Sequence, residues 1–265
     1  MRTSFFKYLF LILIFFYVPL SSFAWGMLGH RIVGQVAESY LTKKTKKEIR
    51  KILGAESVAM SANWADFIKS DSTYDYLDTW HYVNFPKNLQ LPEFQAFVAK
   101  DTGVNAYTKI NFLASELKKK DLPADKKVMY LRLLIHFVGD VHQPMHASPD
   151  GTAGGNTVRV TWFGQNTNLH RVWDSQLIEY QQLSYTEYAA HINHTTKAQR
   201  ALWQGQPLSQ WLFESYTISG GLIDAISEAN SKLSYNYNFQ HVETLNAQLL
   251  KGGVRLAAVL NDIFG

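Results

Sequence analysis

The residues best suited to chemistry lie in one short stretch, His136-Phe-Val-Gly-Asp140-Val-His142-Gln-Pro-Met-His146. His136 and Asp140 are four residues apart, so on a helix they project from one face and can share a metal ion. Pro144 ends such a helix and turns the chain, which brings His146 back toward the same region. Imidazole and carboxylate are the usual zinc ligands where thiolates are absent. The stretch predicts a metal site, against the alternative of a buried helix end whose polar groups satisfy one another.

Histidines and aspartates elsewhere in the chain extend this prediction. His170 and Asp174 repeat the four-residue spacing in a segment with a helical pattern. The candidate ligands outnumber what one tetrahedral zinc ion binds, so we expect a cluster of two or three metal ions. Such clusters mostly serve phosphoester hydrolysis, in which the ions activate water and stabilise the leaving oxygen. The candidate ligands are His30, Asp66, His81, His136, Asp140, His146, His170 and Asp174.

The composition limits both the metal ligands and the class of protein. With 18% charged and 14% aromatic residues, the chain is expected to bury a sizeable core rather than to be disordered. There is no cysteine, which excludes thiolate zinc sites and disulfides. The formal net charge of +4 is small, so overall charge is only a weak indication of a nucleic-acid partner.

The first 24 residues have the pattern of a signal peptide. A positively charged start precedes an apolar run, residues 9–20, which is too short for a membrane anchor. Ser22 and Ala24 occupy the two small positions of a cleavage site, which predicts Trp25 as the first mature residue. We therefore expect a secreted or periplasmic protein that has no stable membrane association after the signal peptide is removed.

The remaining residues, 25–265, are predicted to form one mostly α-helical domain with a small β-hairpin. Residues 157–163 alternate like a strand and residues 164–166 suit a turn, which predicts the only β element. Residues 79–86 are expected to be extended or loop-like, and residues 148–156 a loop. The lysines of the second predicted helix are interpreted as a solvated face. The predicted helices are residues 32–41, one ending at 53, 61–69, 105–119, one from 123 through 140, 168–180, one capped by 184–187, 211–226 and 240–264.

Several motifs, in order along the chain, resemble those of the secreted single-strand nucleases of the S1/P1 type. They are Trp-Gly-x-Leu-Gly-His from residue 25, Trp-Ala-Asp ending at 66, His-Tyr-Val-Asn from 81, the stretch 136–146, Gly-Gly-Asn ending at 156, Asn-Leu-His-x-x-Trp-Asp ending at 174, and Lys-Gly-Gly-Val-Arg-Leu-Ala from 251. The resemblance implies the fold of zinc nucleases and phospholipases C. It also implies an endonuclease, expected to be monomeric, that hydrolyses single-stranded DNA and RNA to 5′-phosphate products and has 3′-nucleotidase activity.

The resemblance further implies three zinc ions, a close pair that activates water and a third ion that stabilises the departing 3′ oxygen. For one zinc of the pair, the matching ligands are Asp66, His81, His136 and Asp140. For its partner, they are the α-amino group and carbonyl oxygen of Trp25, His30 and the shared Asp140. For the third zinc, they are His146, His170 and Asp174.

Substrate contacts are implied at four further positions. Lys69 matches a basic residue, often arginine in fungal members, that stabilises developing charge, and Asn156 matches a phosphate contact. Tyr82 matches an aromatic residue that stacks on a base, which favours single strands because the base must be unstacked. Asn84 stands where fungal members often have aspartate, and its amide offers both a donor and an acceptor to a base edge.

Two other functions compete with the nuclease. A zinc-dependent phospholipase C has a similar three-metal site, but its last ligand pair carries glutamate where this chain has Asp174. A non-enzymatic zinc-binding periplasmic protein would not need Lys69, Tyr82 or Asn156. His142 matches no ligand of the family and is interpreted as a structural residue or as a support for the ligands.

Overall fold

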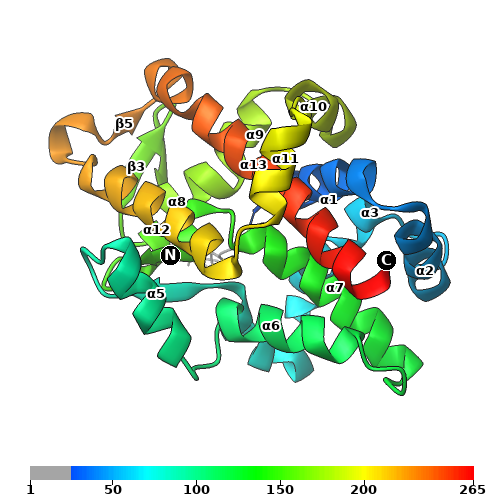
Figure 1. The fold of residues 1–265 in the computed structure, drawn as a ribbon. Helices are drawn as coiled ribbons and strands as arrows, with labels where there is room; N and C mark the ends of the chain where they lie inside the picture. The colour runs from blue at the N-terminus through cyan, green and yellow to red at the C-terminus, as the bar shows by residue number, and fades with distance from the viewer. Residues whose placement is uncertain (1–24) are drawn as a thin grey trace, which may run out of the picture.

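The computed structural model describes residues 25–265, and the predicted signal peptide, residues 1–24, lies outside the described residues. Figure 1 shows a largely helical molecule in which the long C-terminal helix α13 (Tyr235–Phe264) runs between the other helices. Helix α1 (Met27–Tyr40) packs along it, and a continuous hydrophobic core extends from Trp25 to Leu260. The prediction of a mostly α-helical fold with a small β-hairpin is confirmed.

The other elements have the following bounds. The remaining helices are α2 (Lys43–Leu53), α3 (Val58–Ser61), α4 (Trp64–Phe67), α5 (Leu91–Lys100), α6 (Ala106–Leu117), α7 (Ala124–Asp140), α8 (Leu169–Arg171), α9 (Leu177–Tyr180), α10 (Tyr185–Ile192), α11 (Lys197–Gln204) and α12 (Leu208–Asp224). The 3-10 turns are η1 (Ile68–Ser70), η2 (Ser72–His81), η3 (Pro144–His146), η4 (Ala153–Gly155) and η6 (Glu228–Asn230), and η5 (Val172–Gln176) is a π-helical turn. The strands are β1 (Val83–Phe85), β2 (Ala147–Pro149), β3 (Arg159–Trp162), β4 (Gln165–Asn168) and β5 (Lys232–Leu233).

Helix α7 carries the central motif, and prolines set both of its ends. Pro123 stands before the first turn, where its missing N–H leaves no hydrogen bond unmade. Residues 133–140 of α7 are all buried, as expected for a helix that passes through the core. After the helix ends, Pro144 opens the 3-10 turn η3, which returns the chain toward His81.

The prediction that the hairpin is the only β element was wrong. Strands β3 and β4 form the predicted antiparallel hairpin, but β5 joins β3 in parallel, with Trp162 opposite Leu233. Strand β1 pairs in parallel with β2, with Val83 opposite Ala147. These strands have two or three residues each, too few for an alternating pattern, and their partners are far away in the sequence. The pairing of β1 with β2 holds the chain after His81 beside the chain after His146.

Other local predictions also need correction. Residues 79–81 end the 3-10 helix η2, so only the second half of the segment 79–86 is extended. The segment 148–156 contains most of β2 and the turn η4, not only loop. The segment 61–69 is divided among α3, α4 and η1, and residues 168–180 include a π-helical turn. Helices α5 and α11 were missed, and α11 has no buried residue that could give an apolar period.

Candidate metal centre

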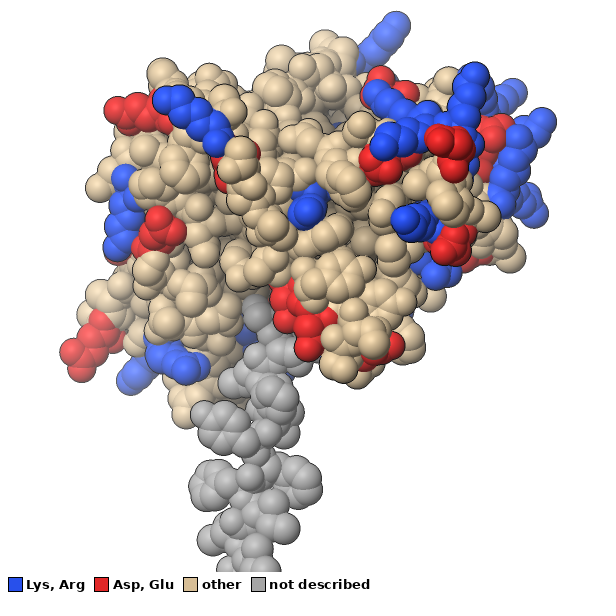
Figure 2. Space-filling view, turned by 90° about the horizontal axis from the view of Figure 1, so that it is seen from below, with Lys and Arg blue, Asp and Glu red and all other residues tan. Residues whose placement is uncertain are grey.

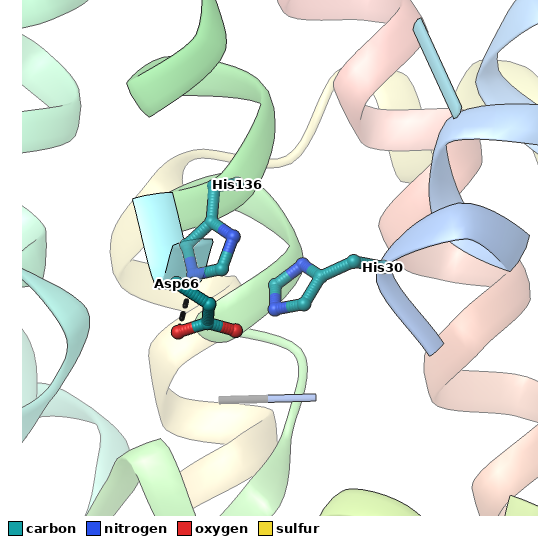
Figure 3. Close-up of side chains that lie close together, drawn as sticks. All are labelled: His30, Asp66 and His136. Carbon is teal, nitrogen blue, oxygen red and sulfur yellow. Dashed lines mark ion pairs between the residues drawn. The ribbon is translucent and has the colours of Figure 1, made fainter. Parts of the chain in front are cut away.

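All eight candidate His and Asp ligands, which come from several elements, gather around the end of α7 and the turn that follows it. They are at most 6% exposed, and they form three groups in which one ligand atom of each residue lies within 4.8 Å of the others. Two groups share His136 and therefore form one larger cluster. The groups are His30, Asp66 and His136 (Figure 3); His81, His136 and Asp140; and His146, His170 and Asp174.

Asp140 lies between the imidazoles of the larger cluster. Its Oδ1 atom is 3.3 Å from His30 Nε2. Its Oδ2 atom is 3.0 Å from His81 Nδ1 and 3.3 Å from His136 Nε2. Figure 3 shows His30 from α1 and His136 from α7 approaching the carboxylate of Asp66 from two sides. Because the two oxygens of Asp140 face different imidazoles, this carboxylate has the arrangement that a bridge between two metal ions requires.

Backbone carbonyls orient three of the imidazoles. His136 Nδ1 donates to the carbonyl of Ala62 at 2.6 Å, and His146 Nδ1 donates to that of His81 at 2.8 Å. His170 Nδ1 donates to the carbonyl of Gly154 at 2.6 Å. A hydrogen on Nδ1 leaves the Nε2 lone pair as the metal donor, and such outer contacts are usual for metal-binding histidine.

The cluster contains buried polar atoms that lack hydrogen-bond partners. Within the described residues, ten buried side-chain atoms have no partner, and six of them belong to the candidate ligands. Burying such atoms unpaired is costly, so their concentration here fits metal ions as the missing partners. The six atoms are both ring nitrogens of His30, Asp66 Oδ2, His81 Nε2, Asp140 Oδ1 and His146 Nε2.

Burial also sets the protonation of the ligands. It lowers the pKa of His136 to about 4 and the pKa of His30 well below its ordinary value. Burial raises the pKa of Asp174 to about 6 and raises the pKa of Asp140 well above its ordinary value. The imidazoles of His30 and His136 are therefore neutral near pH 7, the form that binds metal. Positive charge nearby, such as metal ions supply, favours the ionised form of these buried carboxylates.

A cleft of about 540 Å³ opens over the larger cluster and over the group formed by His146, His170 and Asp174. Lys69 lies at its edge, where its Nζ is 2.7 Å from Asp66 Oδ1 and its side chain is 19% exposed. Tyr82 is 42% exposed, so its ring is accessible to a planar ligand. Asn84 accepts a hydrogen bond from Ser148, and Asn156 donates to the carbonyl of Ala153. The predicted site residues that line the cleft are Lys69, His81, Tyr82, Asn84, His146, Asn156 and His170.

The sequence reasoning missed several residues of the site. Asp78, Met145, Ala153 and Gly154 also line the cleft. Ala153 and Gly154 both have positive φ, 47° and 60°. A Cβ on Gly154 would lie 2.7 Å from the carbonyl oxygen of Met145, so only glycine lets the chain pass so close. The pair of glycines before Asn156 was the available sequence signal for this turn.

Gln143 was also missed, although it belongs to the central motif. It is fully buried, its amide group donates a hydrogen bond to Asp174 Oδ1, and its Oε1 accepts from the backbone N–H of Met145. Gln143 therefore holds one oxygen of Asp174 in place. The other oxygen, Oδ2, is 2.9 Å from His170 Nε2.

Trp25 and His142 have distinct positions. Trp25 is fully buried, and a Cβ on Gly139 would lie 3.9 Å from its ring and 2.9 Å from His30 Nδ1. Trp25 thus packs beside the larger cluster. His142 Nδ1 donates to the carbonyl of Val138 and its Nε2 accepts from Arg255 at 3.1 Å. Because both of its nitrogens are engaged, the structural interpretation of His142 is supported.

A helical fold with buried His and Asp groups beneath an open cleft defines the class as a metal-dependent hydrolase. Comparison with known proteins gives the family, since residues 25–265 match the S1/P1 nuclease model. Endonuclease 5 and Endonuclease 4 of Arabidopsis thaliana are 30% and 29% identical, and Nuclease S1 of Aspergillus oryzae is 28% identical. Each alignment covers 91% of this chain and 90%, 89% and 92% of the respective relative. The chain belongs to the S1/P1 nuclease family and is a zinc-dependent hydrolase that acts on nucleic acids.

Proposed function

We propose that this protein is a secreted or periplasmic endonuclease that hydrolyses single-stranded DNA and RNA to 5′-phosphate products and also dephosphorylates 3′-nucleotides. The observation that carries the proposal is the composition of the cleft. A cation, an accessible aromatic ring and two amides line it, together with three of the candidate metal ligands, His81, His146 and His170. A nucleotide presents the matching groups, namely a charged phosphate, a planar base and hydrogen-bonding base edges.

The proposal includes three zinc ions. Asp66, His81, His136 and Asp140 would hold the first, and His30, Asp140 and the chain start at Trp25 would hold the second. His146, His170 and Asp174 would hold the third, and these three form a group of their own in the structure. When bound, the zinc ions supply an activated water and positive charge for the leaving oxygen.

The protein's own residues then bind and orient the substrate. Lys69, held beside Asp66, provides positive charge for the phosphate as negative charge grows in the transition state. Asn156 donates to a phosphate oxygen, and Tyr82 stacks on the base of the nucleotide that leaves. A base in a duplex is already stacked and paired, so this arrangement favours single strands.

A substrate panel separates this proposal from the other functions. Purified zinc-loaded protein is incubated with single-stranded DNA, RNA, a 3′-mononucleotide and phosphatidylcholine, and the Asp174→Asn variant serves as a control. We expect hydrolysis of the first three, 5′-phosphate ends on the oligonucleotide products, and a large loss of rate in the variant. Hydrolysis of phosphatidylcholine alone would establish a phospholipase, and zinc binding without hydrolysis would establish a storage protein.

Export and oligomeric state are also part of the proposal. The described residues contain no helix that is both long and apolar enough to span a membrane. Residues 1–24 are proposed to be removed after Ala24, and the mature chain is proposed to act as a monomer without stable membrane association.

A further inference from the structure

One end of the molecule is strongly basic. Helix α2 contributes six Lys or Arg side chains, and residues 118–120 and 126–127 contribute five lysines. The acidic side chains in or beside these segments are Glu38, Glu48, Glu56, Glu116, Asp121, Asp125 and Asp262. Eleven cations against seven anions give a net charge of +4, which equals the net charge of the whole chain.

These segments come together in space. Side chains of α2, the corner between α6 and α7, and the end of α13 line one hollow. Figure 2 shows blue side chains gathered at the right-hand end, where Figure 1 places α2 and the C-terminus. We call this surface, formed by α2 and residues 118–127, the basic end. Its position shows that the lysines of α2 belong to a larger charged surface.

Only part of this charge is neutralised locally. Lys51, Lys118 and Lys119 form ion pairs with acidic side chains. No acidic side chain of residues 25–265 lies within ion-pair distance of Lys120 or Lys126. Like charges held together on one surface repel, so an anionic partner would relieve the repulsion.

Four aromatic rings and one lysine form a row of contacts between the basic end and the cleft. Tyr130 contacts Phe112 with ring centroids 5.7 Å apart, and Lys109 Nζ lies 5.5 Å from the Phe112 ring and 4.4 Å from the Trp80 ring. Trp80 contacts Tyr76 at 5.7 Å. Phe112 is 39% exposed and Tyr76 is 52% exposed, so both rings offer area to a ligand. We call these five residues the aromatic row.

The aromatic row connects the two surfaces. Lys126 of the basic end is four residues before Tyr130 and shares its face of α7. At the other end, η2 carries Tyr76 and Trp80 together with Asp78 and His81, which line the cleft. Along α7, Lys126 and Asp140 are separated by roughly 20 Å at 1.5 Å per residue, which corresponds to about six stacked nucleotides.

We propose that the basic end and the aromatic row bind single-stranded nucleic acid outside the cleft, so that a long strand is held at two places at once. The inference rests on the proposed function. Lysines neutralise phosphates and exposed rings stack with bases of any identity. A second attachment raises the effective concentration of the strand at the cleft. An anionic lipid surface would also be attracted by the positive charge, but lipid binding would not explain a row of aromatic rings that leads to the cleft.

The test compares two triple variants, each of which loses three positive charges from exposed or partly exposed lysines. Lys120→Gln/Lys126→Gln/Lys127→Gln alters the basic end, and Lys100→Gln/Lys197→Gln/Lys232→Gln removes the same charge elsewhere. The substrates are a DNA strand of about 40 nucleotides and a 3′-mononucleotide. For the basic-end variant, we expect kcat/KM for the long strand to fall roughly tenfold at low salt and its log–log salt slope to become shallower by about 2, at about 0.7 per lost contact. The rate on the mononucleotide and the control variant should change little.

Two results would overturn the inference. One is an unchanged salt slope in the basic-end variant, and the other is an equal loss in the control variant. Phosphatidylglycerol vesicles that bind the wild type but not the basic-end variant, without any effect on the long strand, would assign the surface to lipid instead. Binding of an uncleavable phosphorothioate strand, followed by fluorescence anisotropy, tests the surface without hydrolysis. If the mononucleotide and the strand are both left intact, the proposed function fails, and anisotropy still decides this inference.

Discussion

His136 and His142 illustrate how a residue's surroundings decide its role. Each donates a hydrogen bond from Nδ1 to a backbone carbonyl, and both are fully buried. The Nε2 atom of His136 faces Asp140 and His81, whereas that of His142 accepts a hydrogen bond from Arg255. The guanidinium of Arg255 keeps its protons, so its hydrogen bond occupies the Nε2 lone pair of His142 and leaves none for a metal ion. The same residue type therefore suits a metal ligand in one case and a structural link in the other.

Lys69→Ala should lower kcat by about 100-fold while changing KM much less, because the charge is needed mainly in the transition state. Steady-state kinetics on single-stranded DNA check this expectation. Lys69→Arg should retain or improve the rate, and Lys100→Ala, at an exposed lysine on α5, is the control. A change confined to KM would make Lys69 a ground-state binding residue.

Gln143→Met should weaken the third zinc selectively. Methionine keeps much of the buried volume but cannot donate to Asp174, and loss of an outer hydrogen bond typically costs 10- to 100-fold in metal affinity. Competition with a chelator, followed by metal analysis, should show one zinc lost early and two retained. If the weakest zinc is held equally tightly in wild type and variant, Gln143 does not position Asp174.

At the scale of elements, α12 and α13 hold the end of α7 in place. The buried carbonyls of the residues that directly follow α7 need hydrogen-bond partners outside the helix. Here Ser215 of α12 donates to the carbonyl of Val141 at 2.6 Å, and Gln248 of α13 donates to that of His142 at 2.9 Å. Arg255 of α13 is fully buried and donates hydrogen bonds to His142, which follows α7, and to Glu214 of α12. Three helices thus fix the turn that connects the two groups of ligands.

Glu214→Gln should reduce stability at neutral pH and make it less sensitive to acid. Burial alone would raise the pKa of Glu214, but Arg255 and Lys251 lower it below its ordinary value. A carboxyl group with a lowered pKa in the folded state stabilises the protein above its unfolded pKa, near 4.5, and loses that contribution as the pH falls through the folded value. Thermal melting at a series of pH values should therefore show that the difference between wild type and variant shrinks as the pH falls below the unfolded pKa. Parallel curves would contradict the ion-pair account.

The start of α1 gives a prediction about processing. A free α-amino group, with a pKa near 8, is a good zinc donor once it is deprotonated, whereas a peptide nitrogen is not. Trp25 is fully buried beside the larger cluster, and the N–H of Gly26 donates to the Asp174 carbonyl, so an extra residue has little freedom there. Protein beginning Met-Trp25 should therefore bind the second zinc weakly and hydrolyse single-stranded DNA slowly. Equal zinc content and rate for this form and for protein processed to Trp25 would show that the amino group is not a ligand.

At the scale of the whole molecule, the sequence predicted the local helices and the candidate ligands better than the connections between them. The pattern of α7 and its prolines gave the position of His136 and Asp140, and the structure brings all eight candidate ligands together. Strands β1 and β2 escaped prediction because each has only three residues and pairs across more than sixty positions. The turn at Ala153 depends on positive φ that no apolar pattern reveals.

The surface was the least predictable part of the molecule. The lysines of α2 suggested only a solvated face, because their proximity to residues 118–127 is a property of the folded chain. In the same way, the row from Tyr130 to Tyr76 combines residues from α7, α6 and η2. Spacing in the sequence reports which residues share a helix face, but not which faces meet.

Three zinc ions should occupy the larger cluster and the group formed by His146, His170 and Asp174, and anomalous diffraction at the zinc absorption edge tests this most directly. Crystals of protein processed to Trp25 should show three peaks. Two should lie about 3.5–4 Å apart on either side of Asp140, as in two-metal hydrolytic sites, and the third among His146, His170 and Asp174. A single peak, or no peak at His146, His170 and Asp174 in active protein, would contradict the account.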